Sequence, residues 1–214
     1  MVVRLCHGVM DDTMSKIKKL INPKNDLYYR LKEYVLSSNF LWSYNESAVN
    51  EVDIDESDKD KGKYTNIPVY GHTVIGRPQS YDMNNPLTTI DRNDNLVSLV
   101  DDWVTYGDYV QPFLYDLLCA NPNREECHVK SILRINFNAT HTDVPGRVFP
   151  HLDHDRLPHK NMLVYLTDAG GSTIVGDELH DPEEDDIIVF DSSVKHCHDA
   201  PKNKRRVVMV MTFI

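Results

Sequence analysis

The chain has 214 residues, of which 41% are hydrophobic and 26% charged, and its formal net charge is −10. This balance predicts one globular domain, and the negative charge disfavours nucleic acid or anionic lipid as the main partner. No run approaches the roughly 20 apolar residues of a membrane span, and the start lacks a secretory signal pattern. We therefore expect a cytoplasmic protein with no membrane partner.

The first 125 residues are expected to be helical and irregular, and to support a second part of the chain. Asn25 or Asp26 begins a predicted helix that ends near Ser38. Residues 51–63 alternate acids and lysines, which predicts an exposed, mobile loop. The residues expected on the buried face of the helix are Leu27, Leu31, Tyr34 and Val35.

A second helical pattern begins near Asn95, and we expect it to break at Gly107 and continue to about Cys119. Its apolar side chains recur at helical spacing, which is more typical of core packing than of a cofactor contact. The expected core residues are Leu96, Leu99, Val100 and Trp103 before the break, and Phe113, Leu114, Leu117 and Leu118 after it.

From residue 126 the pattern changes to short β-prone runs separated by turn residues. Strands are predicted over 129–138, 161–167, 186–191 and 206–214. Several short strands without helical spacers favour a sandwich or barrel. In the first of these strands one face carries Ile132, Arg134, Asn136 and Asn138, which meet either solvent or a polar cavity inside a barrel.

His151 and Asp153 lie two residues apart after the first strand. On an extended chain both side chains point to one face, where they can share a metal ion. The motif is weak alone, because His141-Thr-Asp143 repeats it ten residues earlier. His196 follows 45 residues after His151, just beyond an apolar strand, and would complete a set of two histidines and one carboxylate. Such a set suits non-haem Fe(II), but zinc hydrolases use similar ligands.

Arg205 and Arg206 open the last predicted strand, nine and ten residues after His196. A buried guanidinium commonly holds a carboxylate through two hydrogen bonds. 2-Oxoglutarate needs such a partner for the carboxylate that lies away from the metal. A solvated charge pair at the start of a strand is the alternative interpretation.

Together these features resemble the Fe(II)/2-oxoglutarate-dependent dioxygenase superfamily, near its prolyl-4-hydroxylase-like branch. The resemblance covers roughly residues 129–214 and depends on the order of several elements. These are Phe149-Pro-His-Leu-Asp-His-Asp155, Met162-Leu-Val-Tyr-Leu-Thr167, Gly170-Gly-Ser-Thr173, Asp186-Ile-Ile-Val-Phe190, His196 and Arg206-Val-Val-Met209.

The resemblance implies a mainly β chain with N-terminal helices and a double-stranded β-helix core, of the jelly-roll or cupin-like kind, within one domain. Residues 126–214 would form the catalytic core and residues 1–125 its support. His151, Asp153 and His196 would bind Fe(II). Arg206, with Arg205 in reserve, would bind 2-oxoglutarate together with Tyr165 and Asn136. Dioxygen would be the second substrate, and hydroxylation would release succinate and carbon dioxide.

Some features depart from the family pattern or leave alternatives open. His198 is a rival metal ligand, and Ser172 stands where the family usually has an acid. The acid-rich segment 177–186 is either a solvated loop or a selector of basic substrates. A peptidyl residue such as proline is the favoured substrate, and a small metabolite is next. A cupin-like metal-dependent hydrolase or isomerase and a non-enzymatic β-sandwich binding module remain as alternative functions.

Overall fold

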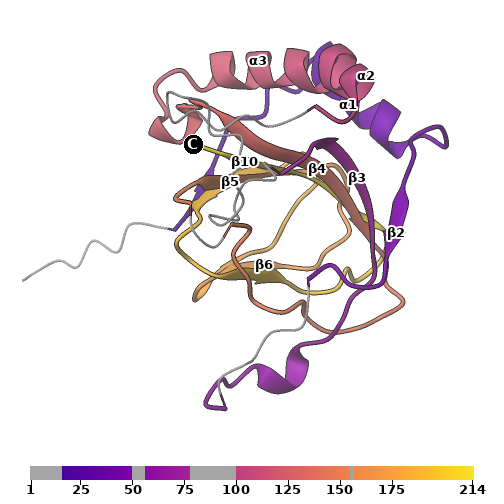
Figure 1. Cartoon of the computed structure of the whole chain (residues 1–214), viewed down its shortest axis with the longest axis vertical. Helices are drawn as coiled ribbons and strands as arrows, with labels where there is room; N and C mark the ends of the chain where they lie inside the picture. The colour runs from indigo at the N-terminus through magenta and orange to yellow at the C-terminus, as the bar shows by residue number, and fades with distance from the viewer. Residues whose placement is uncertain (1–15, 50–55, 78–99, 155–156) are drawn as a thin grey trace, which may run out of the picture.

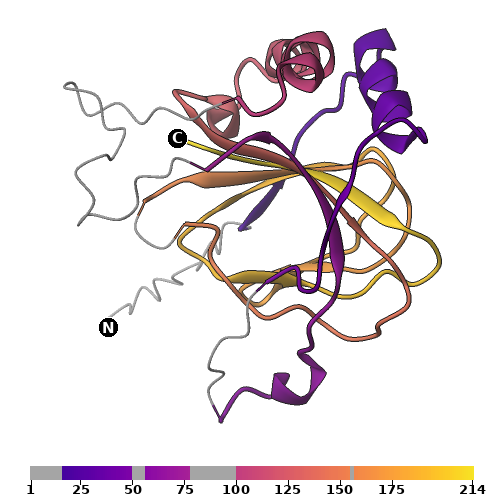
Figure 2. The ribbon, with the colours of Figure 1, turned by 45° about the vertical axis from the view of Figure 1, so that its right-hand side comes forward.

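The structure is a computed structural model that describes residues 16–49, 56–77, 100–154 and 157–214. Two antiparallel sheets face each other, and the helices cover the outer side of the larger sheet (Figures 1 and 2). The predicted mainly β fold with N-terminal helices and a double-stranded β-helix core is thus confirmed. None of the described helices is long and apolar enough to cross a bilayer.

In the described part of the chain, the larger sheet has seven strands and the smaller has three. Across the larger sheet the order is β1 (Ile17–Lys19), β8 (Ile187–Asp191), β5 (Lys160–Tyr165), β10 (Arg206–Phe213), β4 (Ile132–Thr140), β3 (Val69–Ile75) and β2 (Ser43–Asn45). The smaller sheet has the order β7 (Glu178–His180), β6 (Thr173–Val175) and β9 (His196–His198).

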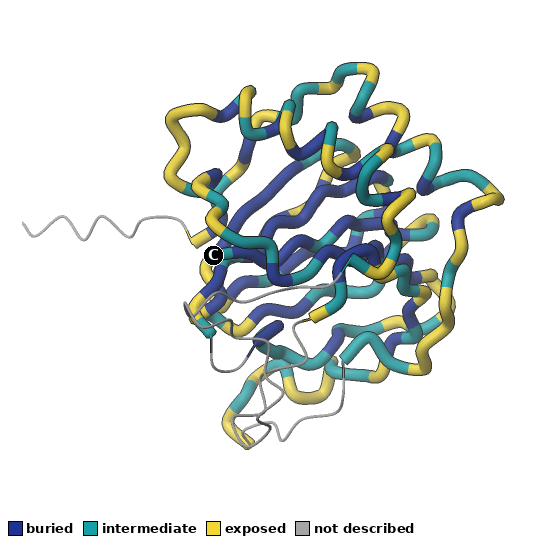
Figure 3. Tube along the Cα trace, turned by 45° about the horizontal axis from the view of Figure 1, so that its top comes forward, coloured by how far each residue is buried: buried dark blue, intermediate teal, exposed yellow. Residues whose placement is uncertain are grey.

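The central strand β10 shows that the two faces of the larger sheet have different neighbours. Val207, Met209 and Met211 belong to the apolar core that includes the helices. The alternate residues face the smaller sheet, and the register places Val210 beside Asn136 of β4 and Thr212 beside Arg134. The central strands are buried along most of their length (Figure 3). The polar face predicted for β4 therefore lines the space between the sheets, as the barrel interpretation required.

Helix α1 (Asp26–Leu36) confirms the first predicted helix. Asn25 caps it by accepting a hydrogen bond from the backbone N–H of Tyr28, which satisfies one of the free donors of the first turn. Leu31 and Val35 are fully buried as predicted, whereas Leu27 and Tyr34 are only half-buried and Tyr28 is fully buried in place of Leu27.

The second helical region differs from the prediction at its start. Residues 95–99 lie outside the described part of the chain. Helix α2 (Trp103–Thr105), a π-helical turn (Tyr106–Val110) and α3 (Gln111–Ala120) follow without the break expected at Gly107. Trp103 was expected in the core but is 70% exposed. The π-helical turn explains why Trp103 is exposed. Its wider turn rotates the residues that precede it relative to α3, so they no longer continue the buried face of α3.

The four strands predicted after residue 126 correspond to β4, β5, β8 and β10. Strands β1, β2 and β3 were not predicted, yet they pair into the same sheet as these four. Within the predicted loop over 51–63, residues 56–63 are described and include a short 3-10 helix, η1 (Lys61–Lys63). A second 3-10 helix, η4 (Glu125–Cys127), leads towards β4.

Most of the acids in segment 177–186 are exposed, in agreement with the solvated-loop interpretation, but the segment includes strand β7 and several of its carboxylates pair with other parts of the chain. Asp185 accepts hydrogen bonds from the Tyr28 hydroxyl and from the ammonium group of Lys32. Lys16 pairs with Asp177, and Lys19 pairs with Asp186 at 3.1 Å. Much of the negative charge of this segment is therefore matched by lysines near the start of the chain, which leaves little of it for a basic substrate.

Candidate metal centre

The backbone brings His151 and His196 together. The segment 147–151 runs antiparallel to β9, with isolated bridges from Arg147 to Asp199 and from His151 to His196. At the second bridge, each backbone N–H donates to the other residue's carbonyl oxygen at 3.0 Å. The two rings lie on the same side, with their centroids 4.4 Å apart. Sheet pairing thus fixes the separation of these two histidines.

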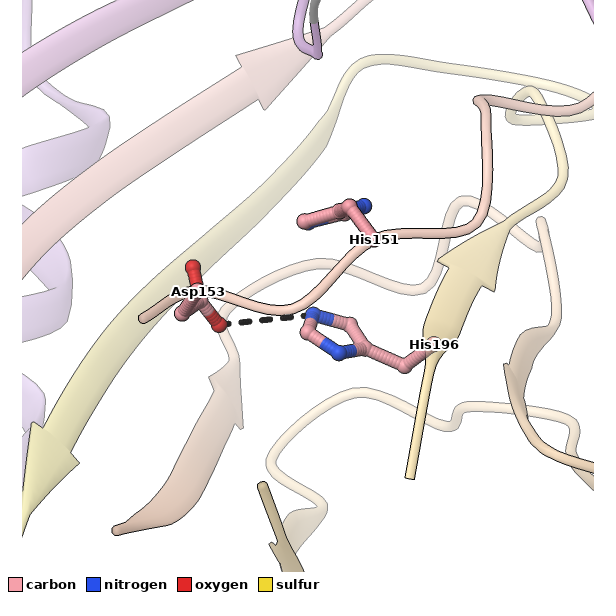
Figure 4. Close-up of side chains that lie close together, drawn as sticks. All are labelled: His151, Asp153 and His196. Atoms are coloured by element: carbon pink, nitrogen blue, oxygen red, sulfur yellow. Dashed lines mark ion pairs between the residues drawn. The ribbon is translucent and has the colours of Figure 1, made fainter. Parts of the chain in front are cut away.

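Asp153 completes the group two residues further along. One possible ligand atom from each of His151, Asp153 and His196 lies within 4.8 Å of the other two, and the three side chains converge (Figure 4). Nε2 of His196 is 3.4 Å from Oδ2 of Asp153. Two ligands at right angles on an ion about 2.1 Å away lie about 3 Å apart, so this spacing suits a shared metal.

The protonation of the three side chains also suits a metal ion. Nδ1 of His151 lies 3.0 Å from the carbonyl oxygen of Phe149, which can only accept, so Nε2 is left free as a ligand. Burial lowers the pKa of His196 to about 4, so this ring is neutral at pH 7. Burial opposes ionisation of Asp153, but two positive charges outweigh it and hold the pKa of the carboxyl below its usual range: His196, which is protonated in the acid range where this carboxyl titrates, and Arg134. Asp153 Oδ2 is buried without a hydrogen-bond partner, as expected of an atom kept for a metal.

Two guanidinium groups lie on the other oxygen of Asp153. Nη1 of Arg134 is 3.4 Å from Oδ1, and Nη2 of Arg77 is 3.6 Å from the same atom. Arg134 extends from the inner face of β4, and Arg77 follows the end of β3. The carboxylate therefore presents Oδ2 to His196 and Oδ1 to the two arginines.

Arg206 forms a second buried polar group between the sheets. It is 5% exposed at the start of β10, and one of its Nη atoms donates to the Thr173 hydroxyl at 3.2 Å. The hydroxyls of Thr173 and Tyr165 lie 2.7 Å apart, and the guanidinium lies 5.3 Å from the Tyr165 ring centre. Within the described residues no carboxylate pairs with Arg206, and its Nε has no partner. A buried cation without an anion is costly unless a ligand supplies one.

The remaining candidates do not belong to the three-residue group. The guanidinium of Arg205 lies over the Trp42 ring, 5.6 Å from its centre, while Arg206 is buried. His198 is not in the three-residue group; burial, with Arg206 nearby, lowers its pKa to about 3. His141 and Asp143 are exposed and line a surface pocket of about 220 Å³ with Tyr44 and Tyr70. Of the two His-x-Asp copies, only the second meets another histidine.

Asn136 is buried on the inner face of β4, which was one of the two environments that the sequence left open for it. Its amide oxygen accepts from the Thr73 hydroxyl at 2.9 Å. Its amide nitrogen donates to the carbonyl oxygen of Phe137 at 3.1 Å and to the side chain of Asn138. Both amide hydrogens are thus engaged by protein groups, and none is left for a carboxylate ligand.

Three residues near these groups were not identified as functional from the sequence. Thr173 was assigned only to a tight turn, and the turn itself is present, with φ of +66° at Gly170 and +81° at Gly171. Arg134 was placed on a polar face, and that alternation was the signal that could have marked it. Arg77 carries no local signal, because its approach to Asp153 depends on how β3 pairs with β4.

Buried His154 makes the stability of the metal-free protein dependent on pH. Burial, together with His159 and Arg77, lowers the pKa of His154 to about 4, whereas an unfolded histidine titrates near 6.5. Between these values the unfolded chain binds more protons, so the free energy of unfolding falls as the pH is lowered from 6.5 towards 4. At pH 5 we expect a loss of about 2 kcal/mol from this ring. Urea unfolding at pH 7 and pH 5 measures the difference in the free energy of unfolding. His154→Phe should lose less of this free energy between the two pH values than the wild type does. An equal loss in the variant would contradict the lowered pKa of His154.

Solved structures with this fold include an oxidoreductase and a prolyl hydroxylase. A 2OG-Fe(II) oxygenase family oxidoreductase from Burkholderia pseudomallei has a TM-score of 0.53 and 11% identity, covering 86% of this chain and 76% of that chain. A prolyl hydroxylase from Trichoplax adhaerens, in complex with a hypoxia inducible factor oxygen degradation domain peptide fragment, has a TM-score of 0.52 and 10% identity, covering 94% and 84%. No protein-family model matches the sequence, and no curated protein matches it significantly. The chain therefore has the fold of 2OG-Fe(II) oxygenases and carries a His-x-Asp and distal His triad.

Proposed function

We propose that the protein is a non-haem Fe(II)- and 2-oxoglutarate-dependent dioxygenase that hydroxylates its substrate. The observation that carries the proposal is Arg206, a buried guanidinium without a carboxylate partner, between the same two sheets as the triad. A zinc hydrolase or an isomerase with this triad has no need of such a cation. A dicarboxylic cosubstrate does, because one of its carboxylates lies away from the metal.

Each group of residues has a distinct role in this proposal. His151, Asp153 and His196 would hold the iron on one face and leave the opposite positions open. Arg206 would bind the far carboxylate of 2-oxoglutarate, with one hydroxyl of the hydrogen-bonded pair Tyr165 and Thr173 as a further donor. Asn136 stays a weaker candidate, because both its amide hydrogens already have protein acceptors.

Iron bound at this site would supply, with 2-oxoglutarate and dioxygen, the oxidation of a C–H bond to C–OH with release of succinate and carbon dioxide. The chain contributes binding and orientation. The Phe149 carbonyl fixes the His151 ring so that Nε2 is the free nitrogen. The apolar side chains of Leu163, Ile188 and Val208 form a buried cluster with Tyr165 and help to exclude water from the Tyr165 side chain.

The favoured substrate is a peptidyl residue such as proline, and a small metabolite is the next candidate. Support for the first comes from the Trichoplax prolyl hydroxylase, which has the same fold and was solved with a peptide fragment. The acid-rich segment gives no support to a basic substrate, because Lys16, Lys19 and Lys32 pair with its carboxylates.

The test is an anaerobic titration with Fe(II) and then 2-oxoglutarate, which needs no knowledge of the substrate. A chelate of 2-oxoglutarate on Fe(II) gives a weak visible charge-transfer band, and we expect this band to saturate at one equivalent per chain. Metal binding without the band would favour the hydrolase or isomerase alternative. Absence of metal binding would favour a binding module with incidental histidines.

A further inference from the structure

Two arginines share one carboxylate at the metal centre. Arg134 and Arg77 lie 3.4 and 3.6 Å from the same oxygen of Asp153. No other ion pair is found for either arginine among the described residues. Arg147 shows the contrast, because it pairs with two acids, Asp60 at 2.7 Å and Asp199 at 2.6 Å.

The excess positive charge persists at neutral pH. A guanidinium stays protonated at neutral pH in proteins, so Arg134 and Arg77 both carry a positive charge there. The protein as a whole has a net charge of −10, so this local excess is not a general property of its surface. The single carboxylate also faces His196 through its other oxygen, at 3.4 Å. When that oxygen binds a metal cation, still less negative charge remains for the arginines.

The two arginines differ in their access to a ligand. The side chain of Arg134 is 19% exposed and extends from the inner face of β4, so it is suited to hold Oδ1 of Asp153 in place. The side chain of Arg77 is 50% exposed, and it lies against the same carboxylate from the end of β3. Arg77 can therefore contact both Asp153 and a molecule that arrives from solvent.

We propose that the substrate carries an oxyanion, a carboxylate or a phosphate group, which Arg77 binds beside the iron while Arg134 positions Asp153. This inference rests on the proposed function. A guanidinium binds either oxyanion through paired hydrogen bonds, so both groups fit the same chemistry. The anion would anchor the substrate next to the metal, and Arg77 would be a residue that determines specificity.

The experiment uses the protein loaded anaerobically with Fe(II) and saturating 2-oxoglutarate. Acetate and inorganic phosphate are added in separate titrations against chloride at equal ionic strength, and the charge-transfer band reports binding near the iron. We expect a saturable change with at least one oxyanion. Arg77→Gln should raise the apparent Kd for that oxyanion about tenfold, and Arg77→Lys should raise this Kd less. Arg30→Gln is the matched control, since Arg30 is exposed and its guanidinium lies 6.0 Å from the Tyr109 ring centre.

The outcomes separate this inference from the proposed function. A response to acetate alone supports a carboxylate substrate, and a response to phosphate alone supports a phosphate substrate. A band that forms but responds to neither anion, or responds with the same Kd in Arg77→Gln, overturns the inference and leaves the proposed function in place. No band in the wild-type protein overturns both.

Discussion

Asp153→Ala is expected to weaken Fe(II) binding at least about a hundredfold and to abolish the charge-transfer band with 2-oxoglutarate. The substitution removes one of the three proposed protein ligands, and the loss of outer contacts alone commonly costs 10- to 100-fold in metal affinity. It also leaves Arg134 and Arg77 without their carboxylate, so positive charge repels the cation at the site. Anaerobic Fe(II) titration measures the affinity, and Asp153→Asn should be less severe because it keeps an oxygen.

The matched control for this prediction is Asp143→Ala. Asp143 has the same spacing from His141 as Asp153 has from His151, but it is exposed on the surface. Unfolding by urea should be measured for both variants, because Asp153→Ala leaves Arg134 buried without an acid. A folded Asp153→Ala protein that binds Fe(II) and gives the band as the wild type does would refute the triad.

Arg206→Gln is expected to weaken 2-oxoglutarate binding about a hundredfold while Fe(II) binding stays unchanged. Removing one partner of a buried, hydrogen-bonded charge pair costs roughly 2–5 kcal/mol, and each 1.4 kcal/mol is tenfold in affinity. Titration of 2-oxoglutarate into the Fe(II)-loaded protein measures the change. Arg205→Gln removes the same charge one residue earlier, where the guanidinium lies over Trp42, and should bind 2-oxoglutarate as the wild type does.

Arg206 is expected to favour 2-oxoglutarate binding but to lower the stability of the ligand-free protein. Without a ligand, Arg206 is a buried cation with no carboxylate partner in the described structure, which opposes folding. Arg206→Met should therefore raise the unfolding free energy of the ligand-free protein, and 2-oxoglutarate should stabilise the wild type but not the variant. A variant that is less stable and still stabilised by 2-oxoglutarate would mean that Arg206 has a structural role only.

The parts of the fold that were predictable have strong local patterns. The strands β4, β5, β8 and β10 are apolar or clearly alternating, and their sequences specify them without help from the rest of the chain. Strand β2 is Ser43-Tyr-Asn45 with every side chain exposed, so only backbone pairing with β3 defines it. Trp103 was misplaced because one π-helical turn changes the register of a stripe that otherwise looks continuous.

In the candidate site too, the residues marked by a local sequence pattern were predictable, and those placed by long-range strand pairing were not. His151 and Asp153 are neighbours along the chain, and His196 follows a recognisable strand, so their sequence pattern indicates a shared ion. The choice between Arg205 and Arg206 depends on which one the pleat of β10 directs inwards, and the structure buries Arg206. The approach of Arg77 to Asp153 is set by the pairing of β3 with β4, which no short motif encodes.

The paired backbone hydrogen bonds between His151 and His196 have a consequence for which metal the protein carries. Because the sheet holds two of the three donors at a set distance, little ordering has to accompany metal uptake. A rigid nitrogen and oxygen site follows the Irving–Williams series, in which nickel, copper and zinc bind more tightly than ferrous iron. Iron occupancy would then reflect the free concentrations of competing ions in the surroundings more than any preference built into the chain.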